Sequence, residues 1–212
     1  MKLSRAMLAI ALVTTLSGCA GMVSKATDRF SNNLGTAVLN SEDPGTVRDG
    51  LPSYLILLDS LVLDANADPN TLLAAAKLNS AYAGNFTGDD KLRARRLSKK
   101  AFDYARRATC AQDAPLCAAI DGDPDTFGKV AAADTNTELM YVLAGAWSGY
   151  LQANSEDWGA IADLPKIQSL LERVVALEPA HDSGQAWTYL GVLNSLRPEA
   201  IGHGCPPMYA DP

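Results

Sequence analysis

The segment from residue 170 to residue 193 constrains the fold more than any other stretch, because it contains two helical patterns separated by a proline. The first pattern carries apolar residues at steps of three and four, which places them on one face of a helix: Leu170, Leu171, Val174, Val175 and Leu177. Pro179 ends this helix, since the residue before a proline is pushed out of the α region. Asp182 or Ser183 can accept hydrogen bonds from free N–H groups of the following helix, which we expect to begin there.

The second helix carries Trp187, Leu190, Gly191 and Asn194 at a spacing that resembles the first helix of a tetratricopeptide repeat. Gly191 has no side chain, so we expect the preceding helix to lie closely against it. Two extra residues lie between Pro179 and Trp187 compared with that pattern, and an ordinary helical hairpin is the alternative interpretation. We predict an all-α fold of tetratricopeptide-like antiparallel helix pairs that form an α-solenoid.

The composition fits closely packed helices in one domain. Of the 212 residues 48% are hydrophobic, which suffices for a sizeable core, and only 7% are aromatic. The formal net charge of −6 argues against nucleic acid and against an anionic membrane surface as partners.

The N-terminus has the features of a secretory signal. Lys2 and Arg5 precede an apolar run over residues 6–16, which is too short for a stable transmembrane helix. The following residues, Leu16-Ser17-Gly18-Cys19, resemble the lipobox of bacterial lipoproteins, in which the cysteine thiol takes a diacylglycerol. We therefore predict a lipoprotein signal peptide over residues 1–18 and lipid attachment at Cys19.

Lipidation also predicts a location for the mature chain. Residues 19–24 form a lipidated tether in this interpretation, and fatty-acyl chains such as palmitate on Cys19 give stable anchoring without a protein span. Ala20 follows the cysteine. In the usual sorting pattern of diderm bacteria, an aspartate at this position marks lipoproteins that are not sent to the outer membrane. This pattern resembles lipoproteins of the outer membrane that face the periplasm.

The remaining cysteines suit an oxidising compartment. Cys110 and Cys117 flank a short acidic segment that contains a proline, and we interpret them as a disulfide pair. Zinc is the alternative, but it would need two further ligands and no histidine is close in sequence. Cys205 is left without a predicted partner. We interpret it either as a free or intermolecular thiol or as an incidental residue of the tail.

Apolar periodicity and Asp-Pro pairs predict further helices along the chain. We expect them over 26–40, from Asp43-Pro44 to an interruption at Gly50-Leu51-Pro52, over 52–65, 69–86 and 91–108, from Asp123, from Asp134-Thr135 to Ala153, and from Asp163 to Pro179. The run over 52–65 is apolar nearly all round, so we expect it to be buried at the centre. The helical-repeat domain is predicted to span 25–198, followed by an irregular tail over 199–212.

One helix of this acidic chain is strongly basic. Its exposed face is predicted to carry Lys91, Arg93, Arg95, Arg96, Lys99, Lys100, Arg106 and Arg107, and its core face Leu92, Leu97, Ala101, Tyr104 and Ala105. A solvated helix face explains such a run, and a docking surface for an acidic partner is the more specific interpretation.

Nothing in the sequence indicates catalysis. The chain has two histidines, His181 and His203, and it contains no G-x-S-x-G, H-E-x-x-H or glycine-rich phosphate loop. Helix starts account for four carboxylates that might otherwise suggest acid–base chemistry: Asp43, Asp68, Asp123 and Asp163. The run from Asp121 resembles a calcium loop, but Thr126 and Ala132 stand where glycine and glutamate are needed. We expect no catalytic residues, no metal and no cofactor.

Aromatic residues are the candidates for ligand contact. We select Tyr82, Phe86, Trp147, Tyr150, Trp158 and Trp187 as ligand-pocket candidates. Aromatic residues at helical spacing more often fill the interior of a repeat, so each is also a core candidate.

Several connected segments resemble the family of TRAP-transporter-associated T components (TatT), which are lipoproteins. They are residues 33–62, the run YARRATC at 104–110, residues 146–179 and the run YLGVLNSLRP at 189–198. The resemblance spans about 30 to 198, and none of these segments is a catalytic motif. Family members continue with further helices where this chain has HGCPPMYADP.

The resemblance implies a periplasm-facing, lipid-anchored helical-repeat scaffold. It implies a homotrimer that encloses a pore, docks the periplasmic solute-binding subunit of a TRAP transporter and conducts a small hydrophobic or organic ligand. It offers no residue-level site. The alternative is a tetratricopeptide outer-membrane lipoprotein that acts in pilus or outer-membrane protein assembly, which shares the anchor and the fold class.

Overall fold

Aspartate side chains determine where several helices begin. Asp68 accepts a hydrogen bond of 2.9 Å from the amide of Thr71, and Asp123 accepts one of 2.9 Å from the amide of Thr126. A proline follows each of these caps at the first helical position. Asp43 likewise accepts from the amides of Gly45 and Thr46. The sequence prediction of caps at Asp43, Asp68 and Asp123 is confirmed.

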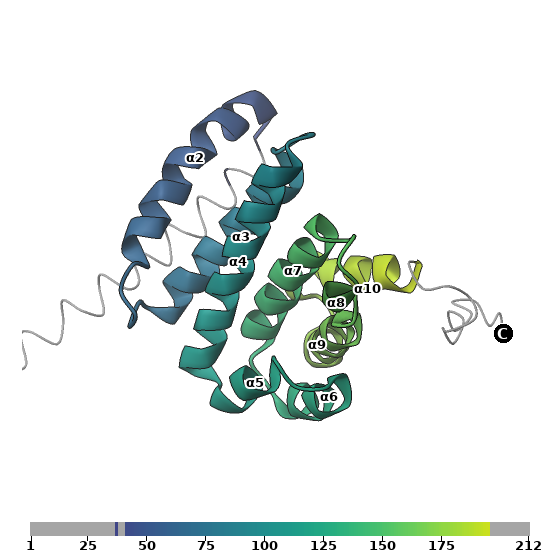
Figure 1. Ribbon diagram of the computed structural model, residues 1–212. Coiled ribbons are helices and arrows are strands. Elements are labelled where there is room, and N and C mark those ends of the chain that lie inside the picture. The colour runs from purple at the N-terminus through teal and green to yellow at the C-terminus, as the bar shows by residue number, and fades with distance from the viewer. Residues whose placement is uncertain (1–36, 38–40, 196–212) are drawn as a thin grey trace, which may run out of the picture. The chain divides into compact units, whose positions relative to one another are not determined.

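The computed structural model describes residue 37 and residues 41–195, and this part of the chain contains helices and no strand (Figure 1). The helices are α2 (Pro44–Leu61), α3 (Pro69–Asn85), α4 (Lys91–Gln112), α5 (Ala114–Ala119), α6 (Pro124–Ala133), α7 (Thr137–Ala153), α8 (Trp158–Ile161), α9 (Leu164–Leu177), a 3₁₀ turn (His181–Gly184) and α10 (Gln185–Ser195). The predicted all-α fold is confirmed. The expected signal peptide, tether, first helix over 26–40 and tail over 199–212 lie outside the described residues.

The chain divides into two units, Met1–Gly50 and Leu51–Pro212. In the first unit, the described residues hold the capped start of α2. The second unit contains the remaining helices, which pack against one another in chain order: α3 on α4, both on α7, and α7 on α9. The short connection between α3 and α4 makes them an antiparallel pair, as a helical repeat requires.

Alanines allow α3 and α4 to approach each other and α7 closely. Ala75, Ala76, Ala101, Ala105 and Ala108 are all fully buried, and they have no side-chain rotamers to restrict on burial. These alanines lie beside larger buried residues, which come both from α3 itself, as Leu72 and Leu73, and from α7, as Leu143.

The central helix is α7, which contacts α3, α4 and α9. Its buried residues lie all around the helix and include Leu139, Met140, Leu143 and Trp147. The expectation that the run over 52–65 is a buried central helix is therefore wrong. That run is the second half of α2, which continues through Pro52 without the predicted interruption, and Ile56, Leu57, Leu61 and Leu63 are exposed.

The joint between α9 and α10 also departs from the prediction. Asp182 and Ser183 do not cap α10 but adopt positive φ angles of 45° and 59° in a 3₁₀ turn, and α10 begins at Gln185. A Cβ atom at Gly191 would meet no atom within 4 Å, so the preceding helix does not lie against this glycine. Leu177 and Leu92, which were expected in the core, are exposed.

Two short helices interrupt the regular pairing of helices. α4 runs to Gln112, four residues beyond its predicted end at residue 108, and is followed by α5 and α6 before α7 begins. α6 packs on α9 rather than extending the α3–α4 pair. The start of α7 at Thr137 is capped by Asn136, two residues after the predicted start at Asp134-Thr135.

Candidate functional site

Two of the aromatic candidates belong to one buried cluster. Trp147 is 1% exposed and lies between the rings of Phe102, with centroids 5.0 Å apart, and Phe127, at 5.8 Å with edge-to-face geometry. The ring of Tyr150 also stacks on the ring of Phe102, with the two centroids 5.5 Å apart. Such arrangements are favourable beyond the area that they bury. Trp147 and Tyr150 therefore join α4, α6 and α7 in the core rather than line an opening.

The other candidates lie apart from this cluster. Tyr82 is buried near the end of α3, 5.6 Å from the ring of Phe86, and the guanidinium of Arg93 lies over its ring and donates to its hydroxyl. Trp187 is 56% exposed on α10. Trp158 begins α8, and its side chain lies outside the described part. The five candidates whose side chains the structure describes do not come together in one pocket.

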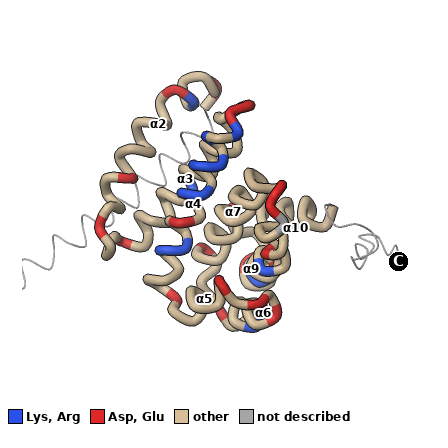
Figure 2. Tube along the Cα trace, viewed as in Figure 1, with Lys and Arg blue, Asp and Glu red and all other residues tan. Residues whose placement is uncertain are grey.

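Figure 2 marks the lysine and arginine positions along α4 in blue. Several of these basic side chains contact neighbouring segments. Arg95 donates from Nε to the carbonyl of Ala153 at 3.0 Å, and its guanidinium forms an ion pair with Glu156. Farther along the helix, Arg107 donates to the carbonyls of Val62 and Asp64 at 2.9 and 2.8 Å.

Two further cations of α4 form ion pairs across the fold. Lys100 pairs with Asp59 of α2, which also accepts a hydrogen bond from the hydroxyl of Tyr104. Arg106 pairs with Asp121, which follows α5. The basic residues thus hold α4 to the end of α2, to the α5–α6 connection and to the end of α7. For these four residues the role is structural, whereas Lys91, Arg96 and Lys99 are exposed, as the interpretation of a solvated helix face expects. The docking surface stays a prediction.

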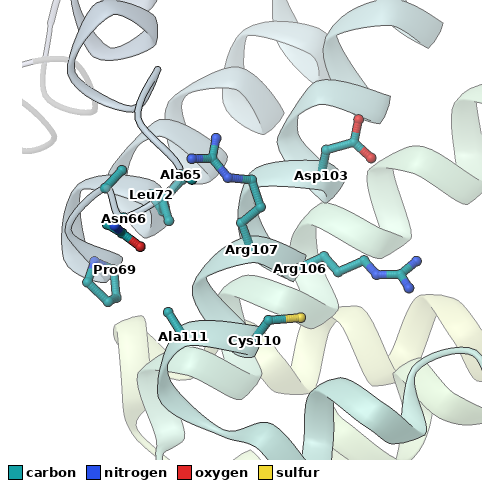
Figure 3. Close-up of a pocket in the computed structure, with 10 residues that line it drawn as sticks. Ala65, Asn66, Pro69, Leu72, Asp103, Arg106, Arg107, Cys110 and Ala111 are labelled. Atoms are coloured by element: carbon teal, nitrogen blue, oxygen red, sulfur yellow. The ribbon is translucent and has the colours of Figure 1, made fainter.

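A hollow open to solvent lies beside α4, with a volume of about 760 Å³ (Figure 3). The α2–α3 loop lines one side of it and the second half of α4 the other. Arg106 and Arg107 leave α4 in different directions, and both guanidinium groups are engaged by the acceptors described above. None of the aromatic candidates lines this hollow, so its walls offer neither an aromatic ligand site nor a pair of uncommitted cations.

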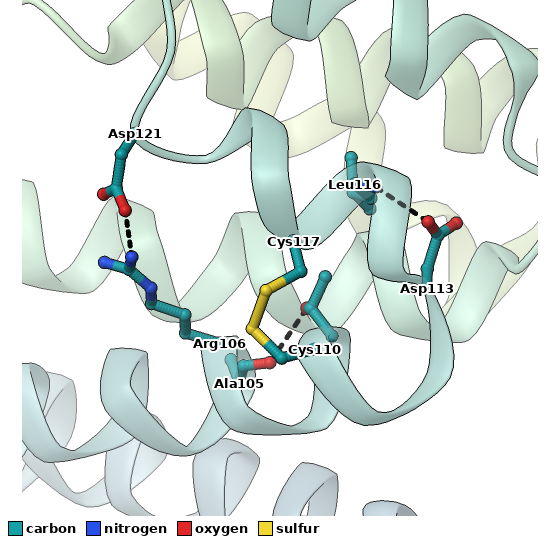
Figure 4. The surroundings of a disulfide bond; sticks show 8 residues. Ala105, Arg106, Cys110, Asp113, Leu116, Cys117 and Asp121 are labelled. Carbon is teal, nitrogen blue, oxygen red and sulfur yellow. Dashed lines mark hydrogen bonds and ion pairs between the residues drawn. A yellow bond between two sulfur atoms is a disulfide. The ribbon is translucent and has the colours of Figure 1, made fainter.

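A disulfide joins Cys110 near the end of α4 to Cys117 in α5, with Cα atoms 4.7 Å apart (Figure 4). Asp113 lies between them and accepts a hydrogen bond of 2.7 Å from the amide of Leu116, and it thereby caps the start of α5 at Ala114. The cap and the disulfide together fix the sharp turn between the two helices. Cys19 and Cys205 lie outside the described residues.

A polar junction that the sequence did not indicate connects α3, α7 and the 3₁₀ turn. His181 lies with Nε2 3.1 Å from Glu138 and with Nδ1 3.0 Å from Glu178. Glu138 also forms an ion pair with Lys77 of α3 at 2.5 Å. His181 and Glu138 are 43 residues apart in the sequence, so no local pattern could have revealed this pair.

Lys166 is a second polar group without a sequence signal. It is 4% exposed, donates to the carbonyl of Ile120 at 2.9 Å and pairs with Asp163 at 2.8 Å. Asp163 makes no capping hydrogen bond, so the prediction that it caps α9 is wrong. The carboxylate instead neutralises a buried ammonium group, which would otherwise be strongly unfavourable in the core.

Within the described residues, no cluster of three or more histidine, cysteine, aspartate or glutamate side chains could hold a metal ion. No helix in this part of the chain has the length and apolar character needed to cross a bilayer.

Comparison with known proteins identifies a family. The model of the family described as TRAP transporter T-component matches residues 40–206, which is most of the chain and includes the first part of the segment 199–212. Neither a curated protein nor a solved structure matches the chain.

Proposed function

The chain belongs to the TRAP transporter T-component family and thereby has a role in TRAP transport, and we propose that it docks the periplasmic solute-binding subunit of such a transporter. The observation that carries this proposal is the family match over residues 40–206. The match favours a transporter role over the alternative of pilus or outer-membrane protein assembly, which the fold class alone cannot separate.

The described residues support a scaffold rather than an enzyme. Both ring nitrogens of His181 are engaged by carboxylates, and the carboxylates of Asp68 and Asp123 cap helices. The arginines at the hollow are held by acceptors of the same chain. The protein therefore acts through its surfaces in this proposal, without a catalytic step or a cofactor.

The remaining parts of the proposal concern location and assembly. A lipid on Cys19 anchors the mature chain in the outer membrane, facing the periplasm, where the solute-binding subunit is found. Three copies assemble, and a small hydrophobic or organic ligand passes through the opening that they enclose. The acidic balance of the chain, with a formal net charge of −6 over the full sequence, is compatible with this location, because anchoring relies on acyl chains rather than on attraction to anionic lipid.

Docking is tested by purifying the acylated full chain from native membranes in mild detergent and identifying the co-purifying proteins by mass spectrometry. We expect enrichment of a periplasmic solute-binding subunit of the TRAP type. Recovery of pilus or outer-membrane assembly proteins in its place would reverse the proposal.

The anchor has its own test, in which the membrane fraction is washed with alkaline carbonate. The wild-type chain should stay with the membranes, and a Cys19→Ala variant, which cannot accept a diacylglycerol, should appear in the soluble fraction. Release of the wild-type chain without detergent would show that Cys19 carries no lipid.

A further inference from the structure

Helix α4 concentrates positive charge on an otherwise acidic chain. It holds eight of the 18 lysines and arginines and one of the 24 aspartates and glutamates, so the rest of the chain has ten basic and 23 acidic residues. Four of these eight cations bind distant segments, as described above. Three others, Lys91, Arg96 and Lys99, are exposed, and Leu92 beside them is 69% exposed. These four residues are called the α4 patch below.

Within the described residues, no other helix or loop neutralises the α4 patch. Lys99 pairs with Asp103 of the same helix at 2.6 Å, and Nε of Arg96 donates to the carbonyl of Leu92 one turn earlier. Lys91 forms no ion pair in this part of the chain. An exposed ion pair within one helix is screened by water and holds its cation weakly. The charge of the patch is therefore available to a partner, unlike that of the four cations that hold α4 to the fold.

The placement of these cations opposes the stability of α4 itself. A helix N-terminus carries a partial positive charge, so acidic residues are favourable in the first turn and basic residues in the last. α6 and α7 follow this rule with Asp125 and Glu138, whereas α4 has Lys91 and Arg93 in its first turn and no basic residue in its last. Asp90, which caps α4, offsets only part of this repulsion. Since folding does not explain the placement, we attribute it to binding.

The pattern of charge indicates a protein partner with an acidic surface. A segment that binds anionic lipid clusters lysines and arginines at one surface. The α4 patch is instead bordered by the exposed carboxylates of Asp89 and Asp103, which a negatively charged bilayer would repel. A protein surface can place its own anions opposite the cations alone. Lysine, arginine and one leucine also give the polar composition that is typical of transient interfaces between proteins.

We propose that the α4 patch is the surface on which the solute-binding subunit docks, through an acidic face of that subunit. Complementary charges on two proteins raise their rate of association and align them as they meet. Leu92 adds an apolar contact among the cations, in a part of the helix that nothing else in the described chain covers. The identity of the partner rests on the proposed function, whereas the location of the surface rests on the structure of α4.

The test measures binding of the purified solute-binding subunit to the immobilised full acylated chain in detergent, by surface plasmon resonance. The variant Lys91→Glu/Arg96→Glu reverses two charges of the patch. At low ionic strength its association rate constant should be lower by about tenfold or more, and the dependence of that constant on salt should be weaker. The fold should persist, because the first change puts an acidic residue in the first turn of α4 and the second puts one four residues before Lys100. Circular dichroism should show helix content and melting no lower than in wild type.

Two controls separate the patch from a general effect of charge. Lys129→Glu reverses an exposed lysine on α6, so it is the matched control for the single variant Lys91→Glu. The α6 variant should associate as wild type does, while Lys91→Glu should associate more slowly. Lys91→Arg/Arg96→Lys keeps both charges of the patch and should also bind as wild type does.

Three outcomes would overturn the inference. They are equal association of wild type and the double variant, equal slowing by Lys91→Glu and Lys129→Glu, and binding of the Cys19→Ala chain to phosphatidylglycerol vesicles that the double reversal abolishes. The last would assign the patch to an anionic membrane. If the subunit binds wild type and the double variant alike, docking stands and this inference alone fails. If the wild-type chain recovers no solute-binding subunit, the docking proposal fails and this inference fails with it.

Discussion

The hydroxyl of Tyr141 in α7 donates a hydrogen bond of 2.6 Å to the carboxylate of Asp182, 41 residues later in the 3₁₀ turn. This bond explains why Asp182 does not cap α10: its side chain points back to the central helix instead. The backbone of Asp182 has a φ of 45°, a left-handed conformation that aspartate tolerates better than most residues. The bond therefore holds the α9–α10 joint against α7.

Tyr141→Phe should destabilise the fold by about 1–2 kcal/mol, which is near the lower end for a hydrogen bond to a charged group because Asp182 remains exposed to water. Urea unfolding followed by circular dichroism measures this loss. Tyr189→Phe is the control, because within the described residues the Tyr189 hydroxyl has no hydrogen-bond partner. Equal midpoints for wild type and Tyr141→Phe would show that the bond contributes nothing.

Stability should fall at alkaline pH. Burial and the hydrogen bond to Asp182 raise the pKa of Tyr141, burial and the bond to Asp59 raise the pKa of Tyr104, and burial raises the pKa of Tyr189. Above the unfolded-state pKa of about 10, the unfolded chain releases protons that the folded chain retains, so each tyrosine lowers stability by up to about 1.4 kcal/mol per pH unit. Below pH 10 the contribution of these tyrosines is constant.

Urea midpoints measured between pH 9 and pH 12 test this dependence. The midpoint should be flat up to about pH 10 and fall beyond it, with a smaller slope for Tyr141→Phe because one of the three groups is removed. Ultraviolet absorption of the tyrosinates should rise together with unfolding. Ionisation of all tyrosines near pH 10 in a chain that stays folded would contradict the prediction.

Ser183→Gly should stabilise the chain. Ser183 has a φ of 59°, which costs about 1–2 kcal/mol for a residue with a Cβ, while glycine adopts this angle freely but loses more entropy on folding. The net gain should be about 0.5–1 kcal/mol in a urea titration. Thr188→Gly, at an exposed helical position of α10, is the matched control and should instead be destabilised. A loss of stability in Ser183→Gly would mean that the serine side chain matters in the turn.

The structural features that the sequence predicted are those that depend on residues close together in the chain. The caps at Asp43, Asp68 and Asp123 follow from an aspartate–proline pair and three following residues, and the structure contains them. The caps expected at Asp163 and at Asp182, neither of which is followed directly by a proline, do not form. Lys166 pairs with the first carboxylate and Tyr141 donates to the second. Asp182 shows the limit most clearly, since its partner lies in another helix and no local pattern predicts it.

The central helix was misplaced for a related reason. Apolar character all around a helix indicates burial, and both the run over 52–65 and α7 have it. Which of the two is buried depends on the neighbours: α3 and α4 present small alanines to α7, whereas Ile56 and Leu57 of α2 stay exposed. The basic face of α4 was equally ambiguous, because its partners Asp59, Asp121 and Glu156 come from three distant segments.

Reduction of the Cys110–Cys117 disulfide should lower the free energy of unfolding by about 2–3 kcal/mol, the entropic cost expected for a loop closed across a separation of 7 residues. Urea titrations with and without dithiothreitol measure the change. A Cys110→Ser/Cys117→Ser double variant should match the reduced protein and respond no further to the reductant. An unchanged midpoint, with two new thiols detected by a thiol reagent, would show that the disulfide does not restrain the fold.

Trp147→Ala should be among the most damaging single substitutions in the described part of the chain. The indole is 1% exposed and contacts Phe102 and Phe127, so its removal leaves a cavity where α4, α6 and α7 meet, at a cost of about 3–5 kcal/mol. Trp187→Ala is the matched control: Trp187 is 56% exposed, so the same change should cost the isolated chain less than about 1 kcal/mol. Thermal and urea unfolding of the two variants, compared at a concentration at which both are monomeric, gives the difference directly. If Trp147→Ala melts as wild type does but no longer binds a ligand or the solute-binding subunit, Trp147 lines a site rather than the core.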